Sequence, residues 1–362
     1  MEAVQKTPER EAFYKKIDGE NLSALWNVMS DLITPEPRSA CRPHLWKFDS
    51  IRDYMTEAGK LITAKEAERR VLVLENPGLR GQSKITTSLF AGVQMVVPGD
   101  IAPAHRHSQS ALRFVLEGKG AATAVDGERT LMEPGDFVIT PSMTWHDHSK
   151  ETSEPMLWLD GINIPMVQYF DASFAEGSNE DQQKISKPAG DSFARYGHNL
   201  LPVDEKRKSK TSPIFNYPYS YTREALERAR ARDEWDACHG LKLKFSNPET
   251  GDFAMPTIGT FIQLLPKGFK TARYRSTDAS VFAAIEGKGR TRIGDQPFES
   301  GARDLFVVPS WHWVTHEADT DAVLCVNYAQ RAAVRLSANG VDGFGCLSVV
   351  EAPPGIGVRL SC

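Results

Sequence analysis

The sequence lacks the features of several protein classes. It has only five cysteines among 362 residues, they are scattered, and no two form a Cys-x-x-Cys pair. This usage argues against both a disulfide framework and a thiolate metal site. No apolar run approaches membrane-spanning length, and the opening MEAVQKTPEREAFYKK lacks the apolar core of a signal peptide. We therefore expect a protein of the reducing cytoplasm with no membrane partner.

An excess of charge of one sign is also missing. The formal net charge is −4, with 25% charged and 41% hydrophobic residues. These proportions are ordinary for a soluble globular protein and give no indication of a nucleic-acid partner. A chain of 362 residues is long enough for two domains of ordinary size.

What the sequence does contain is a histidine-rich stretch at 99–148. It reads GDIAPAHRHSQSALRFVLEGKG and, after a polar turn, EPGDFVITPSMTWHDH, and it holds four of the nine histidines. His105 and His107 are two residues apart, so they share one face of an extended strand, while His146 follows a second strand-like run. Imidazoles gathered from separate strands indicate a metal, and neutral imidazole suits iron, copper, zinc or nickel.

The last third of the chain repeats this stretch approximately. The sequence EGKG occurs at 117–120 and again at 286–289, and GDFVITPS returns as RDLFVVPS. Two copies of a β-rich module separated by a linker are indicated. At the positions of the three histidines the second copy has Tyr274, Ser276 and Val314. Since the scaffold is kept and all three imidazoles are lost together, we infer that the histidines of the first copy are functional.

Apolar periodicity divides the chain into four parts. The first is an N-terminal helical segment, whose apolar face would pack on the next domain or on another subunit. A β-module, a linker with a helix starting near Thr222, and a second β-module follow. The predicted boundaries are 1–60, 61–175, 176–240 and 241–362.

Alternation within the strands suggests which polar residues face inward. Gln94 lies opposite the apolar Val93 and Met95, facing either solvent or a site. If one strand ran unbroken from His105, the histidines would share a face with Arg113, although a turn within SQS would break this parity.

The two histidine motifs resemble the cupin signature. The resemblance implies a mainly β bicupin, made of two jelly-roll β-barrels with N-terminal and linker helices and with the metal inside the first barrel. The matching positions are Gly99, His105 and His107 in the first motif and Gly135, Pro141 and His146 in the second.

One position departs from that signature. Most metal cupins carry a glutamate after the second histidine, where this chain has Ala111 and Leu112, followed by Arg113. Three neutral imidazoles leave the metal charge unbalanced, which favours a chelating anion together with a small molecule such as dioxygen.

Over nearly the whole chain, the sequence is similar to the bicupin gentisate 1,2-dioxygenases and their relatives that act on salicylate and 1-hydroxy-2-naphthoate. Matching stretches include ENPGL, FAGVQMVVPGDIAPAHRHSQSALRFVLEG, WLDGINIPMVQYFDASFAE and SPIFNYPYSYTREAL. The resemblance implies Fe(II) held by His105, His107 and His146, and a homo-oligomer, usually a tetramer. It also implies that dioxygen cleaves the ring between the carboxyl-bearing and hydroxyl-bearing carbons. Gentisate would give maleylpyruvate.

The resemblance also implies substrate contacts. Arg69 and Arg113 would meet the substrate carboxylate and the dioxygen side, and Asp160 would orient His148 or the gentisate 5-hydroxyl. Without the resemblance, Arg69 and Asp160 could equally form a buried ion pair or a turn contact. The residues that match the family's substrate pocket are Arg69, Gln94, Arg113, His148, Trp158 and Asp160. Gln94 and His148 would supply hydrogen bonds near the ring oxygens.

The sequence is compatible with three other functions. The same chemistry could act on 1-hydroxy-2-naphthoate or salicylate, although Phe90 stands where the salicylate-cleaving relative has a tryptophan, which favours gentisate. A non-enzymatic bicupin that stores or binds a small molecule would hold no transition metal. A cupin isomerase would use a metal without dioxygen.

Overall fold

The computed structural model describes residues 7–150, 154–204, 209–329, 348–350 and 360–361. Contacts divide the chain into a unit of residues 1–38 and a unit of residues 39–362. The helices are α1 Pro8–Asp18, α2 Leu25–Leu32, α3 Phe48–Leu61, α4 Ala64–Ala67, α5 Ile164–Tyr169, α6 Asp191–Tyr196 and α7 Tyr219–Arg230. Among the described residues, no helix is both long and apolar enough to cross a bilayer.

The N-terminal unit contains α1 and α2. The Thr7 hydroxyl caps α1 by accepting a hydrogen bond from the backbone N–H of Arg10 at 3.3 Å, and proline follows at the first helical position. The indole N–H of Trp26 in α2 donates to the hydroxyl of Tyr14 in α1 at 3.0 Å. The helical character predicted for this segment is therefore present.

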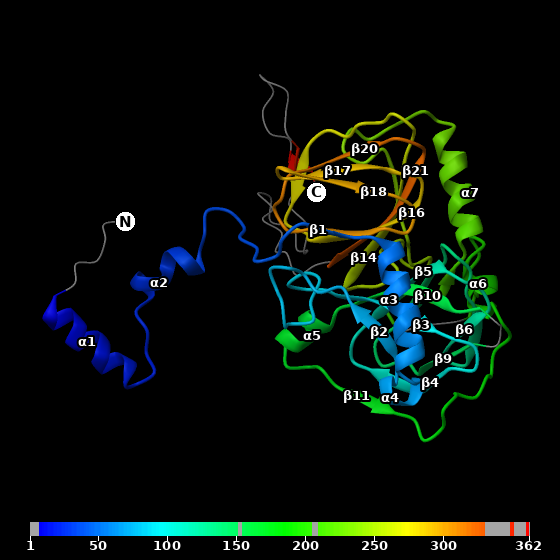
Figure 1. Cartoon of the computed structure of the whole chain (residues 1–362), viewed down its shortest axis with the longest axis horizontal. Coiled ribbons are helices and arrows are strands. Elements are labelled where there is room, and N and C mark those ends of the chain that lie inside the picture. The colour runs from blue at the N-terminus through cyan, green and yellow to red at the C-terminus, as the bar shows by residue number, and fades with distance from the viewer. Residues whose placement is uncertain (1–6, 151–153, 205–208, 330–347, 351–359, 362) are drawn as a thin grey trace. The chain divides into compact units, whose positions relative to one another are not determined.

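The larger unit holds two β-barrels, each made of two sheets (Figure 1). The first barrel has the strand orders β12-β8-β5-β10-β3-β2 and β11-β4-β9-β6-β7. Its strands are β2 Arg70–Val73, β3 Phe90–Val96, β4 Ile101–His107, β5 Ala111–Glu117, β6 Ala121–Val125, β7 Glu128–Leu131, β8 Phe137–Thr140, β9 His146–Lys150, β10 Met156–Ile162, β11 Ala175–Gly177 and β12 Asn216–Tyr217.

The second barrel repeats this plan with the orders β1-β19-β16-β21-β14-β13 and β18-β17-β20-β15-β22-β23. The predicted mainly β bicupin fold is confirmed. Its strands are β1 His44–Trp46, β13 Leu241–Lys244, β14 Ile258–Leu265, β15 Tyr274–Ser276, β16 Ser280–Glu286, β17 Gly289–Ile293, β18 Gln296–Ser300, β19 Leu305–Val308, β20 Val314–Ala318, β21 Ala322–Ala329, β22 Ser348–Val350 and β23 Leu360–Ser361.

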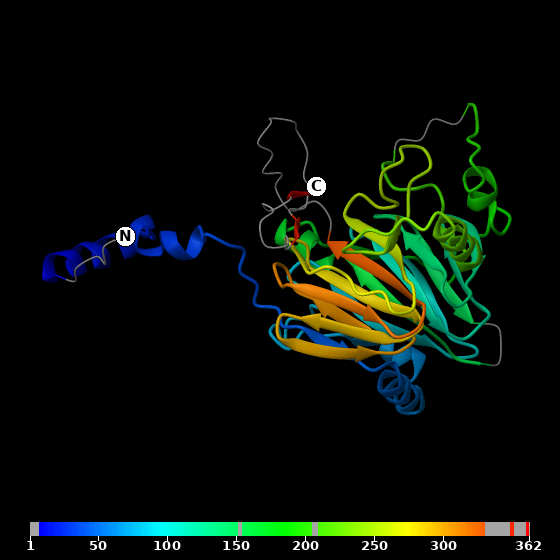
Figure 2. The same ribbon diagram turned by 90° about the horizontal axis from the view of Figure 1, so that it is seen from above.

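The main core lies between two of the six-stranded sheets, the one that contains β5 in the first barrel and the one that contains β16 in the second. One apolar cluster joins residues of both, including Leu112 and Phe114 from β5 with Val281 and Ala283 from β16. Figure 2 shows the cyan-to-green strands of the first barrel beside the yellow-to-orange strands of the second. Each barrel also has a smaller apolar cluster. The cluster of the first barrel contains Trp158, and that of the second contains Phe282 and Phe306. Alternating residues of these two sheets therefore face either the shared core or a barrel interior.

Each barrel also pairs with a strand that precedes the other barrel in sequence, and each caps the helix that follows that strand. β1 precedes the first barrel but pairs with β19 of the second, and the Asp304 carboxylate accepts from the backbone N–H of Phe48, where α3 begins, at 2.9 Å. Reciprocally, β12 precedes the second barrel but pairs with β8 of the first, and Asp136 accepts from the N–H of Tyr219, where α7 begins, at 2.8 Å. A carboxylate at a helix N-terminus is stabilising. The boundaries predicted for the four parts remain a prediction.

Replacing Asp304 with alanine is expected to lower the free energy of unfolding by about 2 kcal/mol. Asp304 is buried and also accepts from the backbone N–H of Gly301 and from Lys47. Two backbone N–H groups would therefore lose their acceptor, and Lys47 would keep only the carbonyl of Glu299. Urea unfolding measures the change. The exposed Asp295→Ala is the control and should leave the midpoint in place. An unchanged midpoint for Asp304→Ala would contradict the role of this carboxylate.

Candidate metal centre and substrate pocket

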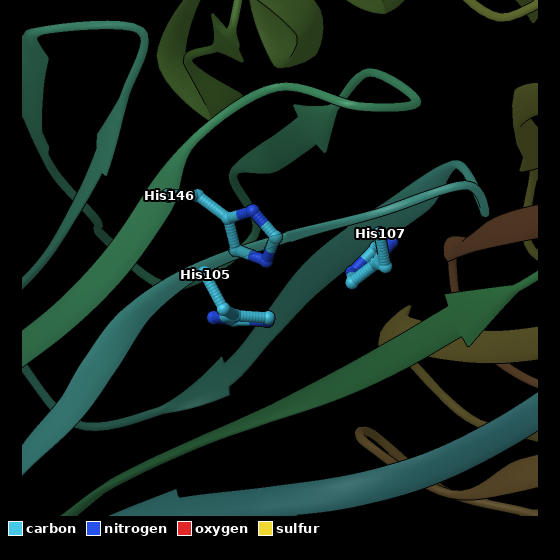
Figure 3. Close-up of side chains that lie close together, drawn as sticks. All are labelled: His105, His107 and His146. Carbon is cyan, nitrogen blue, oxygen red and sulfur yellow. The ribbon is translucent and has the colours of Figure 1, made fainter. Parts of the chain in front are cut away.

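The three predicted histidines lie together inside the first barrel. His105 and His107 extend from β4, His146 extends from β9, and the backbone register pairs His105 with His146. One ligand atom from each lies within 4.8 Å of the others, and Figure 3 shows the three rings gathered together. These residues form a group that can hold a metal ion.

Each imidazole is fixed through its Nδ1. That atom lies at hydrogen-bond distance from a backbone carbonyl two residues away, which leaves Nε2 as the ligand atom. Burial, followed by the positive charge of Arg69, lowers the pKa of His105 to about 3. Neutral imidazoles bind a metal without first releasing a proton. The carbonyls belong to Pro103 for His105 at 3.0 Å, Gln109 for His107 at 2.9 Å and Thr144 for His146 at 3.0 Å.

The possibility that one unbroken strand runs from His105 to Arg113 is wrong. β4 ends at His107 and β5 begins at Ala111 in the other sheet of the barrel, because the chain turns at residues 108–110. Arg113 is nevertheless buried, and its Nη1 donates to the Thr140 hydroxyl at 2.6 Å. The turn breaks the simple alternation, but closure of the barrel brings the two strands back around one interior.

Arg113 is paired with Asp160 on the neighbouring strand β10. Their Nε and Oδ1 atoms are 3.4 Å apart, and the indole N–H of Trp158 donates to the same carboxylate oxygen at 3.1 Å. Burial raises the pKa of Asp160 to about 6, against the opposing effect of Arg113. Burial lowers the pKa of Arg113 to about 10. Near neutral pH the two groups therefore form a buried ion pair.

A second arginine adds positive charge next to the histidines. Arg69 immediately precedes β2, and its Nη2 lies 2.7 Å from Nδ1 and 2.9 Å from Nε2 of His105. A metal bound to that Nε2 would therefore replace this contact. The side chain is only partly exposed. Two arginines and one buried carboxylate, Asp160, therefore surround the histidines, so the buried surroundings carry positive charge even before a metal contributes its own.

Three polar atoms face this interior with no hydrogen-bond partner among the described residues. They are Nε2 of Gln94, Nε2 of His148 and Nε of Arg113, the last of which lies at ion-pair distance from Asp160 without forming a hydrogen bond to it. The side chains are 2%, 1% and 4% exposed, so the solvent-facing alternative for Gln94 is wrong. Gln94 also pairs in register with Trp158. Because buried polar atoms are rarely left unpaired, this arrangement favours a polar ligand in the pocket.

Thr123, which is fully buried on β6, was not among the site residues predicted from the sequence. Its hydroxyl lies 2.9 Å from Nδ1 of His148 and 3.2 Å from the sulfur of Met132. The second barrel has the same pair, Thr291 and His316, also at 2.9 Å and also 25 residues apart. A comparison of the two copies for Thr–His pairs at this spacing would have found it. The second copy therefore lost three imidazoles but kept a counterpart of the fourth.

Comparison with known proteins identifies the family. The cupin domain family matches residues 92–162, which include all three clustered histidines. A gentisate 1,2-dioxygenase of Aquipseudomonas alcaligenes is 60% identical over 327 residues, which are 90% of this chain and 94% of that protein. The chain belongs to the gentisate 1,2-dioxygenase family. As a member of this family, the protein is a ring-cleaving dioxygenase, and the predicted enzyme class is confirmed.

Two further relatives agree with this assignment. A gentisate 1,2-dioxygenase of a Streptomyces species is 35% identical over 319 residues, 86% of this chain and 89% of that protein. The crystal structure of salicylate 1,2-dioxygenase from Pseudoaminobacter salicylatoxidans, in adducts with gentisate, matches with a TM-score of 0.85 and 33% identity, covering 91% of this chain and 92% of that chain. The gentisate 1,2-dioxygenase fold therefore extends over both barrels.

Proposed function

We propose that this enzyme uses Fe(II) and dioxygen to cleave the ring of gentisate and form maleylpyruvate. The observation that carries the proposal is the pair of arginines, Arg69 and Arg113, beside three clustered imidazoles whose pKa values are lowered. A family member 60% identical to the chain is a gentisate 1,2-dioxygenase, which supports this substrate. The crystal structure of a salicylate-cleaving relative with gentisate adds further support.

The donor set fits an iron ion. His105, His107 and His146 would bind it through Nε2, because each Nδ1 lies against a backbone carbonyl. Imidazole suits iron, and the absence of a carboxylate ligand leaves positive charge that an anionic substrate can balance. When bound, iron would be chelated by the substrate's oxygens and would supply the electron transfer that dioxygen chemistry requires.

The two arginines would bind the substrate carboxylate and line the dioxygen side. Arg113 is held by Thr140 and Asp160, so its guanidinium is oriented before substrate arrives. A charge-assisted hydrogen bond in a buried pocket is about twice as strong as a neutral one. Arg69 adds a second cation from the edge of the barrel. Both would bind the acid and exclude neutral ring compounds.

Gln94 and His148 would bind the ring oxygens. Both present a buried nitrogen with no other hydrogen-bond partner among the described residues. Trp158 would orient Asp160 by donating to it, and Asp160 would orient His148 or the gentisate 5-hydroxyl. Together these residues would fix the plane of the ring against the three imidazoles.

Oxygen uptake tests the proposal. The protein is loaded anaerobically with Fe(II), mixed with gentisate in aerated buffer and monitored for oxygen consumption and product absorbance. We expect stoichiometric uptake with gentisate and weaker activity with salicylate or 1-hydroxy-2-naphthoate. No uptake with any of the three acids would contradict the proposal. A storage bicupin would also lack a bound transition metal after purification.

We also infer a homo-oligomer, with a tetramer as the expected form. Apolar side chains on α2 support an interaction between subunits, because Leu25, Trp26 and Leu32 are about half exposed or more. Light scattering after size-exclusion chromatography would give the mass. A mass of one chain would contradict this inference. The cytoplasmic location expected from the sequence stays a prediction.

A further inference from the structure

Thr123 and Met132 form a buried chain of contacts behind His148. The Thr123 hydroxyl lies between Nδ1 of His148 at 2.9 Å and the sulfur of Met132 at 3.2 Å. All three side chains are 1% exposed or less. The other ring nitrogen of His148, Nε2, is buried with no hydrogen-bond partner among the described residues. The tautomer of this histidine therefore decides what the pocket presents to a ligand.

Two arrangements of hydrogen are possible. In the first, the Thr123 hydroxyl donates to Nδ1, so Nε2 carries a hydrogen and Met132 receives none. In the second, Nδ1–H donates to the Thr123 oxygen, whose own hydrogen then points to the sulfur of Met132. The second arrangement makes two hydrogen bonds instead of one, and it leaves no N–H buried without an acceptor.

We propose that Thr123 is a positioning residue, which with Met132 holds His148 in the tautomer whose Nε2 accepts a hydrogen bond from a ring hydroxyl of the substrate. The inference rests on the proposed function, because it concerns the same hydroxylated aromatic acid. It predicts that an acid with ring hydroxyl groups binds more tightly than an acid with none.

The second barrel provides a matched control. Thr291 contacts His316 at the same distance, and both are buried, but no metal-holding group is found there among the described residues. Thr291→Val removes the same kind of contact as Thr123→Val and should reduce stability in the same way. It should leave substrate binding unchanged. A general effect on folding is thereby separated from an effect on the pocket.

The first test reads the tautomer directly by nitrogen-15 NMR of labelled histidines in the protein loaded with diamagnetic zinc. His148 signals are assigned by their loss in His148→Gln. In the wild type we expect the hydrogen on Nδ1. Thr123→Val and Met132→Leu should move it to Nε2, whereas Thr123→Ser should retain it on Nδ1. A wild-type hydrogen on Nε2 would overturn the proposal, as would a Thr123→Val spectrum with the hydrogen still on Nδ1.

The second test measures binding under anaerobic conditions by calorimetry on the Fe(II) protein, with gentisate and with benzoate, which has no ring hydroxyl. We expect the Kd for gentisate to rise about tenfold in Thr123→Val and in Met132→Leu. The benzoate Kd should stay unchanged, as should both constants in Thr291→Val. Equal losses for both acids would overturn the proposal. Should Thr123→Val fail to fold, the nearly isosteric Met132→Leu still decides. If the wild type binds no gentisate, the proposed function fails instead, and the NMR test still decides the tautomer.

Discussion

Replacing His105 with alanine is expected to abolish metal binding and turnover together. The remaining His107 and His146 would supply two of the three nitrogen atoms that lie within 4.8 Å of one another. Two imidazoles do not make up the three protein ligands typical of a catalytic centre with open positions. Arg69 would also lose the ring that it contacts. We expect less than about one hundredth of the wild-type metal content and no detectable oxygen uptake.

Metal analysis and oxygen uptake are measured on the same preparation of the variant. His312→Ala is the control, because His312 lies in the second barrel and likewise has its Nδ1 3.1 Å from a backbone carbonyl. That variant should keep full metal content and activity. A His105→Ala protein that retained one metal per chain would contradict the assignment of the ligands, whatever its activity.

The second large effect is expected for Arg113→Met, which should lower kcat/KM for gentisate about a thousandfold. This factor corresponds to about 4 kcal/mol, as is typical when one partner of a buried charge pair is removed. The substrate carboxylate would lose a cation that Thr140 and Asp160 hold in place. In addition, Asp160 would be left as a buried carboxylate without Arg113, which raises its pKa further.

Steady-state kinetics with gentisate measures the loss, and metal content distinguishes it from damage to the iron site. The metal content should stay at the wild-type level, because Arg113 lies on β5 and the three histidines lie on β4 and β9. Combining Arg113→Met with Asp160→Asn should restore stability but not activity. Arg113→Lys keeps the positive charge without the planar guanidinium, so its kcat/KM should lie between those of the wild type and Arg113→Met. Wild-type kcat/KM in Arg113→Met would exclude Arg113 from substrate binding.

Local sequence patterns were sufficient for the fold class and for the group of three histidines. The His-x-His spacing places two rings on one face of any extended strand, and the glycine and proline positions that mark the turns recur in the second copy. The register of the two barrels agrees with this comparison, because Tyr274 pairs with Val314 as His105 pairs with His146. These features depend on neighbours in sequence or on the repeat, so they can be read without coordinates.

The same patterns were insufficient for the groups around the histidines. Alternation within strands left open whether Gln94 faces solvent or a site. It also placed Arg113 on the same face as the histidines only if one unbroken strand joined them, and the chain turns before Arg113. Burial of both side chains follows from closure of the sheets into a barrel. No local pattern records which side of a strand will be covered.

By itself, the sequence determined two repeated β-modules, a cluster of imidazoles in one of them and a resemblance to ring-cleaving dioxygenases. Only the tertiary structure decided how the modules are joined and what surrounds the cluster. The Asp304 carboxylate accepts a hydrogen bond from the backbone N–H of Phe48 at the start of α3, 256 residues away in sequence. Thr123 and His148, which are also hydrogen-bonded, are 25 residues apart. Such hydrogen bonds form between side chains and backbone that folding brings together from distant parts of the chain. Their partners are set by the packing of whole sheets, which local periodicity does not encode.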